Sequence, residues 1–556
     1  KLDNPYETFK DFYTKDYQKF VEYNIQDVEL VDRLEDKMKL IELCLTMAYD
    51  YKVNYTDVYS QVRCWDTIIY NHLLTKNIQV PPREDQIKDT QYEGAYVKDP
   101  QLGLHNWIVS FDLNSLYPHL IMQYNISPEM FLGVEPKAVG VENFLDEKLN
   151  LKWAKDRNVT IAPNGAMFKR DKQGFLPELM EKMYTERVVF KKKSIEAKKE
   201  FQKTKDPIYK NEISRCHNIQ MAKKISLNSA YGAIGNQYFR YFDVKQAEAI
   251  TLGGQLSIRW IERDVNKFMN KLLGTDNKNY VVASDTDSIY LKLDTLVEKV
   301  CKDKTTKQIT DFIDKAAEEK IQKIIDDSYQ NLANYVNAYQ QKMIMKREAI
   351  ANKGIWVAKK RYMMNVFDEE GIRFDIPKLK IMGVEAVKSS TPEVCRGKIK
   401  DAIRVIMNDS EDALIKFVND FKEVFMTLSP EEVAFPRSCN NVNKYIDSNS
   451  IYKKGTPIHV KGALIYNHNI NKHRLGMKYP LIKDGDKIKF LMLKQPNTVK
   501  DTVISFSTKI PYEFELHKYV DYDTQFEKTF TDPLRFILDS IGWKLEREAT
   551  LEAFFG

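Results

Sequence analysis

The sequence predicts an α+β protein with several domains, and three observations lead to this prediction. A chain of 556 residues is too long to fold around one hydrophobic core. Apolar residues recur at helical spacing within the first 80 residues and again in a Lys-rich stretch after residue 175. Between and after these stretches, short β-branched and aromatic runs have the composition of strands. A hydrophobic content of 43% excludes a disordered chain.

Charge is distributed unevenly along the chain. The net charge is only +6, yet residues 169–224 contain 16 basic and 8 acidic residues. This favours a site for a polyanion, with an ordinary solvated helical face as the alternative.

The six cysteines form no metal or redox motif, and no apolar run has the length of a membrane span. A protein of the reducing cytoplasm is therefore expected.

The first 80 residues are predicted to be helical, over 20–47 and 60–75, with Pro81 and Pro82 ending the second helix. Tyr23 and Asp27 are four residues apart and share one helix face. Without further evidence they are an ordinary surface pair. The apolar face of the first helix comprises Val28, Leu30, Leu34 and Leu40.

An apolar strand over 107–112 ends in Asp112, and a short helix over 118–124 follows it. Residues 131–165 show no regular pattern and are expected to be irregular. The Lys-rich stretch predicts two antiparallel helices, over 175–203 and 211–231, joined at Asp206 and Pro207. Arg187 and Lys191 share a face of the first helix, and Lys224, Asn228 and Tyr231 form a stripe on the second. Such polar stripes suit a triphosphate, with Tyr231 free to stack on a base pair.

A second acidic element is the predicted β-hairpin over 280–293, with Asp285 and Asp287 at its tip. Asp is also a common turn residue, so a turn without further function is the alternative. Together with Asp112, the hairpin brings carboxylates to the ends of apolar strands. Carboxylates placed in this way can hold two divalent metals about 3.5–4 Å apart for phosphoryl transfer.

The remainder of the chain is predicted as a helical region over 310–341, strands over 343–348 and 354–367, and a mixed helical and irregular domain from about residue 384. The second strand contains Lys359, Lys360 and Arg361 next to Tyr362, and Lys388 lies in a basic stretch that could contact phosphates. The chain ends in an apolar cluster of Leu551, Phe554 and Phe555. We expect this cluster to dock in a groove of a partner, with packing on the chain's own last domain as the alternative.

Six short motifs resemble those of the family B DNA polymerases and occur in the family's order. They are Tyr23 with Asp27, Tyr-Glu-Gly-Ala at 92–95, Asp-Leu-Asn-Ser-Leu-Tyr-Pro at 112–118, Lys-Ile-Ser-Leu-Asn-Ser-Ala-Tyr-Gly at 224–232, Asp-Thr-Asp-Ser at 285–288 and Lys-Arg-Tyr at 360–362. Each motif alone is weak, but six in the correct order are specific. The flanking sequence resembles the replicative polymerases of T-even-type bacteriophages.

The resemblance implies a right-hand polymerase architecture with a helical remnant of a 3′–5′ exonuclease domain. The implied divisions are the exonuclease remnant at 1–82, the palm at 83–173 and 236–383, the fingers at 174–235, and the thumb with a clamp-binding tail at 384–556. It also implies DNA-directed DNA synthesis in viral replication, with primer-template DNA and dNTPs as substrates and a sliding clamp as partner.

The resemblance assigns roles to individual residues. Asp112, Asp287 and the Leu113 carbonyl would ligate two Mg²⁺ ions, for which Mn²⁺ could substitute, and Asp285 would be a supporting catalytic carboxylate. Tyr117 would exclude a ribose 2′-hydroxyl, and Lys360, Tyr362 and Lys388 would hold the primer strand. The dNTP contacts would be Leu113, Ser115, Leu116, Tyr117, Arg187, Lys191, Lys224, Asn228 and Tyr231.

Two departures from the family pattern matter. Ser284 replaces the Gly that usually precedes Asp-Thr-Asp, and the first two exonuclease motifs are missing, which leaves only Tyr23 and Asp27. One carboxylate is a poor site for two Mg²⁺ ions, so this chain is expected to polymerise without excising mismatches. A second chain carrying the missing amino-terminal half is expected to dock on helix 20–47, with an incomplete gene sequence as the alternative.

Two rival functions are considered. An RNA-synthesising or reverse-transcribing enzyme is the nearer rival, but the bulky Tyr117 favours DNA synthesis over an RNA-synthesising enzyme, which would carry a small residue there. A catalytically silent DNA-binding subunit of a split polymerase is the rival from another class. The intact pair Asp112 and Asp287 argues against it.

Overall fold

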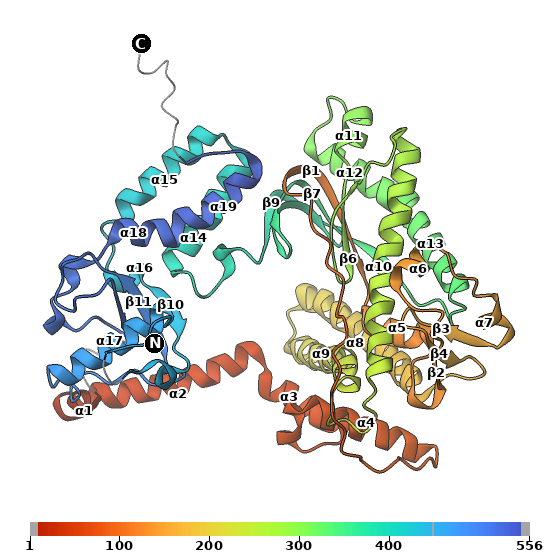
Figure 1. The fold of residues 1–556 in the computed structure, drawn as a ribbon, viewed down its shortest axis with the longest axis horizontal. Coiled ribbons are helices and arrows are strands. Elements are labelled where there is room, and N and C mark those ends of the chain that lie inside the picture. The colour runs from red at the N-terminus through yellow and green to blue at the C-terminus, as the bar shows by residue number, and fades with distance from the viewer. Residues whose placement is uncertain (1–8, 448–449, 546–556) are drawn as a thin grey trace.

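A six-stranded antiparallel sheet forms the centre of the computed structural model, which describes residues 9–447 and 450–545 (Figure 1). The strand order is β5-β6-β1-β7-β8-β9. The strands are β1 (Gly103–Leu113), β5 (Val281–Asp285), β6 (Ser288–Lys292), β7 (Met345–Ala358), β8 (Arg361–Glu369) and β9 (Ile372–Met382). The predicted strand ending in Asp112 and the predicted acidic hairpin are both confirmed, and they lie side by side because β1 pairs with β6.

The two faces of this sheet belong to different hydrophobic clusters, as alternation along a strand requires. Val109, Phe111 and Ile289 join the main core on the helix-covered face, whereas Ile108 and Tyr290 belong to a small cluster on the other face. The helices packed against the sheet include α10 (Val244–Leu273), α12 (Thr306–Ala316) and α13 (Gln322–Tyr335). The sheet is thus anchored on one side by a helical layer.

Two long antiparallel helices form the predicted hairpin, α8 (Phe175–Thr204) and α9 (Pro207–Ile234). Lys205 adopts the left-handed conformation that ends α8, and the Asp206 side chain accepts a hydrogen bond from the Ile208 N–H. Pro207 fits the first position of a helix because its missing N–H would have no partner there. The predicted turn at Asp206 and Pro207 is therefore confirmed, although α9 begins at Pro207 and not at residue 211 as predicted.

The amino-terminal helices are α1 (Phe9–Lys15), α2 (Tyr17–Met38), α3 (Leu40–Tyr51) and α4 (Gln61–Thr75). The prediction of one unbroken helix over 20–47 is wrong, because Lys39 adopts a left-handed conformation that ends α2 and starts α3. Helices α3 and α4 both pack along α9. The amino-terminal helices are therefore part of the support of the helical hairpin.

Residues after about 384 form a second body with its own hydrophobic core, drawn in cyan and blue in Figure 1. Its helices are α14 (Glu393–Asn408), α15 (Glu411–Phe425), α16 (Pro430–Val433), α17 (Ile458–Lys472), α18 (Tyr522–Phe526) and α19 (Asp532–Ile541). It also contains an antiparallel sheet that the sequence did not predict, of β10 (Phe435–Ser438), β11 (Lys487–Met492) and β12 (Val503–Phe506).

Three further predictions need correction. Residues 131–165 are not irregular, because they contribute α6 (Val141–Leu145), α7 (Lys152–Asp156) and two strands of a small sheet, β2 (Phe131–Val134) and β3 (Val159–Ile161), which pair with β4 (Ala166–Lys169). Strands of three or four residues are too short to reveal alternation. The strand predicted over 354–367 is a hairpin, since Lys360 (φ 59°) turns the chain between β7 and β8.

The third correction concerns the long helix α10, which the sequence did not predict. Gly253 and Gly254 lie at its middle and weaken its helical signal. A Cβ on Gly254 would lie 3.4 Å from Leu116 and 3.5 Å from Tyr117, so the glycine permits the close approach of α5 (Leu116–Tyr124) to α10. No helix within residues 9–447 and 450–545 has the length and apolar character needed to cross a membrane.

Candidate active site

Two aspartates from distant parts of the sequence meet where β1 ends. Asp112 is opposite Ser288 in the pairing of β1 with β6, and the Leu113 N–H donates a 2.8 Å hydrogen bond to the Asp287 carbonyl. Thr286 has a φ of 60°, which is strained for a β-branched residue. Its N–H donates to the Tyr96 carbonyl at 3.0 Å, so the connector before β1 holds the strained tip in place.

The two carboxylates are in an environment that disfavours their charge. Burial, together with the nearby charges of Asp287 and Glu348, raises the pKa of Asp112 to about 7. Burial likewise raises the pKa of Asp287. Neither carboxylate makes an ion pair with another described residue. A half-buried pair of carboxylates would be stabilised by a cation.

A cleft of about 850 Å³ extends from these carboxylates to the helical hairpin. It brings together most of the site residues predicted from sequence. The predicted residues that line it are Asp112, Leu113, Ser115, Leu116, Tyr117, Arg187, Lys191, Lys224, Asn228 and Asp287. Strand ends therefore form one side of the cleft, and the polar stripes of α8 and α9 form the other.

The hairpin side of the cleft is positively charged. Arg187, Lys191, Lys192 and Lys224 all line it, and none of them forms an ion pair within the described residues. Arg187 donates from Nη1 to Ser115 Oγ at 3.0 Å, while its buried Nε has no hydrogen-bond partner in the described part of the chain. Burial lowers the pKa of Arg187. Cations without partners in a cleft favour an anionic ligand.

The loop between the strand and the helix is held in an unusual conformation. Ser115 precedes α5 with a φ of 47°. The carbonyl of Ser115 is within 2.9 Å of His119 Nδ1, and the His119 ring packs edge-on against Tyr184 at 4.5 Å between centroids. This buried contact orients the loop that carries Ser115. It could not have been expected from the motif, because it depends on the packing of α5 against α8.

Tyr117 and Tyr231 lie against each other at the floor of the site, with ring centroids 4.7 Å apart. Tyr117 comes from α5 and also packs near Gly254 of α10. Tyr231 continues the stripe of Lys224 and Asn228 along α9, although it does not line the cleft itself. The two rings are therefore in contact, and a substitution of one ring changes the packing of the other.

Other predicted residues lie outside the cleft. Lys360 Nζ contacts both carboxylate oxygens of Asp285, at 2.6 and 2.9 Å. The Tyr362 ring is buried, stacks on Trp356 and shares a 2.8 Å hydrogen bond with Tyr290. Lys388 Nζ is 2.9 Å from Glu385 in a separate pocket of about 390 Å³.

The predicted exonuclease pair and the predicted tail have different outcomes. Tyr23 and Asp27 lie on α2, and the Tyr23 ring is buried against Phe9 and Phe12. Neither residue lines the cleft. Leu551, Phe554 and Phe555 lie outside the described residues.

Sequence reasoning missed several residues of the site. Tyr184, Lys192, Thr286 and Glu370 line the cleft, and Glu348 contributes to the raised pKa of Asp112. Lys192 lies in the same basic run as Lys191, and this run was a local signal for it. Glu348 had a weaker signal, because it follows Lys346 and Arg347 in β7 and no local pattern separates it from these charged neighbours. Glu370 reaches the cleft because it lies in the turn between β8 and β9. No local sequence pattern links this turn to Asp112.

The residues present fit a divalent metal of the Mg²⁺ type. Within residues 9–447 and 450–545, no three His, Cys, Asp or Glu side chains converge as a complete ligand set. Asp112 and Asp287 supply two hard oxygen ligands, which is the usual protein contribution when phosphate oxygens and water complete the shell. A bound cation would stabilise the charged form of both carboxyl groups and so lower their raised pKa values.

The shifted pKa of Asp112 predicts a pH-dependent stability without metal. In the folded protein Asp112 holds its proton up to about pH 7, against an ordinary value of 3.8. Folded molecules therefore bind more protons than unfolded ones in this range, so this contribution to stability falls as the pH rises. In EDTA, Asp112→Asn should gain stability relative to the parent from about pH 4 to pH 7. The gain should be on the order of 1–2 kcal/mol, because partial solvent exposure weakens the shift.

Thermal unfolding of both proteins at several pH values, with and without Mg²⁺, measures this difference. Added Mg²⁺ should stabilise the parent at pH 8 and leave the Asn variant nearly unchanged. Equal melting temperatures for parent and variant at pH 5 and pH 8 in EDTA would contradict the assignment of the shift to Asp112.

Ser284, the departure at the hairpin, has a backbone conformation that does not require glycine. It lies in β5, is buried, and is absent from the positions with positive φ. Its hydroxyl has no hydrogen-bond partner within the described residues. The strain of this hairpin is located at Thr286, two residues further along.

Comparison with known proteins identifies relatives of the chain. The model of DNA polymerase family B matches residues 53–541. The DNA-directed DNA polymerase of Enterobacteria phage T4 is 31% identical, over 97% of this chain and 65% of the relative. That of Escherichia phage RB69 is 32% identical, over 100% of this chain and 66% of the relative. DNA polymerase 1 of Pyrococcus abyssi is 27% identical, over 82% and 48%. The chain thus spans about two thirds of the length of its phage relatives.

Proposed function

Since this chain belongs to DNA polymerase family B, we propose that it adds deoxynucleotides to the 3′ end of a primer on a DNA template during viral DNA replication. One observation carries the proposal. Among the described residues, a single cleft has Asp112 and Asp287 without a paired cation at one end and four cations without a paired anion at the other. A metal-bound nucleoside triphosphate supplies both missing partners, because it presents cations to the first group and phosphates to the second.

The residues of the cleft have separate tasks in this reaction. Arg187, Lys191 and Lys224 bind the triphosphate, and Ser115 and Asn228 add neutral hydrogen-bonding groups. Leu113 and Leu116 contribute backbone groups from the loop. Asp112 and Asp287 hold the metal ions, two Mg²⁺ or in their place Mn²⁺, which when bound stabilise the charge that develops on the attacking and leaving oxygens. Asp285 remains paired with Lys360, and this ion pair stabilises the tip of the hairpin of β5 and β6.

The proposal assigns a right-hand architecture to the fold. The six-stranded sheet with its helices is the palm (83–173 and 236–383), the helical hairpin forms the fingers (174–235), and the second body is the thumb (384–556). Residues 1–82 are the remnant of an exonuclease domain. Lys360 lies at the turn between β7 and β8, Tyr362 lies in β8, and Lys388 lines a pocket together with residues of β10 and α19. The proposal assigns the primer strand to these three residues.

Primer extension with defined templates and nucleotides tests the function. A labelled DNA primer is annealed to a DNA or an RNA template and is incubated with dNTPs or NTPs and Mg²⁺. The proposal expects extension with the DNA template and dNTPs. Preferred use of RNA or NTPs would favour the rival enzymes, and binding without extension would favour a silent subunit.

We place a docking segment for a sliding clamp at Leu551, Phe554 and Phe555. The support is the apolar composition of this cluster at residues 551–555. Deleting residues 550–556 should abolish the stimulation of synthesis by a clamp and leave synthesis without a clamp unchanged. An equal loss of both activities would instead indicate packing on the thumb.

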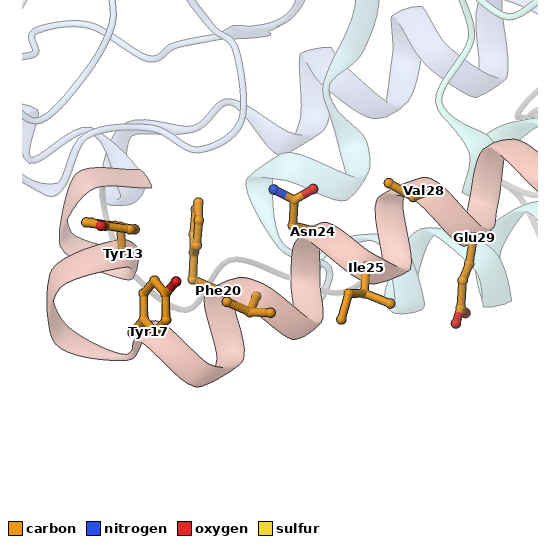
Figure 2. A pocket seen from close by; sticks show the side chains of 8 residues that line it. Tyr13, Tyr17, Phe20, Asn24, Ile25, Val28 and Glu29 are labelled. Carbon is orange, nitrogen blue, oxygen red and sulfur yellow. The ribbon is translucent and has the colours of Figure 1, made fainter.

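A second partner is proposed for the exposed face of α2. On α2, Val28 and Leu34 are 60% and 56% exposed and Leu30 is half-buried. Leu40, at the start of α3, is 49% exposed. Figure 2 shows the start of this face, a hollow of about 430 Å³ lined by aromatic and aliphatic side chains that include Tyr17, Phe20, Ile25 and Val28. Exposed apolar faces of this extent favour a protein partner.

The proposed partner is a second chain that carries the amino-terminal segments of the phage relatives and completes the nuclease around Tyr23 and Asp27. The present chain should not excise a mismatched 3′ end, and mixing it with the partner should restore excision. Excision by the chain alone would refute the incomplete nuclease, and no gain on mixing would refute the split arrangement.

A further inference from the structure

Helix α9 makes contacts on two faces, and only one of them lines the cleft. Lys224 and Asn228 point into the cleft. The opposite face is held by the amino-terminal helices, because the Tyr51 hydroxyl donates to the Ala222 carbonyl at 2.8 Å and Trp65 Nε1 donates to the Ser226 carbonyl at 3.2 Å. Residues of the two faces alternate along one helix, so the position of the second face determines the position of the first.

Lys223 follows Ala222 on α9 and lies at the edge of the second face. Its side chain is only 9% exposed, and Nζ contacts Asp50 of α3 at 2.8 Å and Glu186 of α8 at 2.7 Å. Three helices therefore meet at one ammonium group. Burial alone would lower the pKa of Lys223, but its hydrogen bonds to Asp50 and Glu186 outweigh this and hold the pKa above its usual value.

The two acidic partners have neighbours that matter for nucleotide binding. Glu186 directly precedes Arg187 on α8, and Lys223 directly precedes Lys224 on α9. The ion pairs thus fix α8 and α9 relative to each other next to the residues proposed to hold the triphosphate. A groove of about 1060 Å³ beside the cluster, lined among others by Tyr49 and Phe190, leaves space for the helices to move if the cluster is broken.

We propose that the Asp50–Lys223–Glu186 cluster is a positioning device that sets the distance and orientation between Arg187 on α8 and Lys224 on α9 for nucleotide binding. The proposal rests on the function proposed above. It gives the amino-terminal helices a role in nucleotide binding that is separate from any nuclease. Lys223 acts through Lys224 and does not itself touch the nucleotide.

Replacing Lys223 should weaken nucleotide binding more than it slows chemistry. Lys223→Met leaves two partly buried carboxylates facing each other, which pushes α3 and α8 apart. The KM for dNTP should rise about tenfold or more, while kcat and the affinity for primer-template stay within about threefold, because the metal-binding strands are untouched. Lys223→Arg should restore KM to within about threefold, since a guanidinium can pair with both carboxylates.

The matched control is Asp66→Asn, which breaks the 2.8 Å pair between Asp66 of α4 and Arg240, outside α9. It should leave KM within about twofold. If Lys223→Met fails to fold, Asp50→Asn and Glu186→Gln take its place, and each should raise KM. Combining these two changes should raise KM by less than the product of the single effects, as expected for residues that act as one unit.

Hydrogen exchange of the free protein gives a readout that does not require activity. The amides of residues 222–231 should exchange faster in Lys223→Met than in the parent, and equally fast in Asp66→Asn and the parent. Unchanged KM and unchanged exchange in the Lys223 variants would overturn the positioning role, as would an equal rise of KM in the Asp66 control. A parent protein that extends no primer would refute the proposed function, and the exchange result would still test the cluster.

Discussion

Asp112→Asn and Asp287→Asn should each remove nearly all primer extension while leaving the affinity for primer-template largely intact. Both side chains line the cleft, and neither has a cation partner among the described residues. Each substitution keeps the shape of the side chain but removes a charged metal ligand. This loss should cost on the order of several kcal/mol of transition-state stabilisation.

Asp285→Asn is the matched control, because Asp285 lies in the same turn but is paired with Lys360 and does not line the cleft. Its effect on extension should be clearly smaller than that of Asp287→Asn. Single-turnover extension at saturating dNTP, with DNA binding measured in parallel, gives both quantities. Extension by either Asn variant within about tenfold of the parent, or roughly 1.4 kcal/mol, would contradict the assignment of these carboxylates as metal ligands.

Tyr117→Ala should raise the insertion of ribonucleotides relative to deoxyribonucleotides by at least about 10²-fold, more than the loss of one small contact gives. The ring lies in the cleft next to the loop of Ser115 and is fixed by Tyr231 and by the close approach of Gly254. We expect a ring packed in this way to exclude a 2′-hydroxyl by overlap, because its neighbours restrict its movement.

Tyr117→Phe separates the ring from its hydroxyl. It keeps the ring and should keep the discrimination between sugars. The ratio of kcat/KM for dNTP to that for the matching NTP, measured for the parent and both variants, decides the matter. An unchanged ratio in Tyr117→Ala would leave Tyr117 with a structural role only.

Local sequence determined those parts of the protein that depend on neighbouring residues. The hairpin of α8 and α9 follows from helical periodicity together with Asp206 and Pro207 at the turn, and the acidic hairpin follows from two β-branched runs around Asp285 and Asp287. The stripe of Lys224 and Asn228 was likewise readable, since residues four apart on a helix share a face. Both of these side chains line the cleft.

Tertiary structure alone decided which of these elements come into contact and which charged side chains form ion pairs. Strand pairing brings Asp112 to Asp287 across a sequence distance that no periodicity spans, and the turn that adds Glu370 becomes part of the site in the same way. Lys360 illustrates the limit most clearly. The resemblance implies a primer contact for Lys360, and the fold adds an ion pair with Asp285 that no local pattern indicates.

The same holds for the buried cluster of Asp50, Lys223 and Glu186. In the sequence Lys223 is one more lysine of a basic helix. Whether an ammonium group faces solvent, a ligand or two carboxylates depends on burial and on the elements packed around it, and these are set by long-range contacts. The sequence by itself therefore determined the local elements and their chemistry, while the tertiary structure decided which charges are paired, because pairing is a property of distance in space.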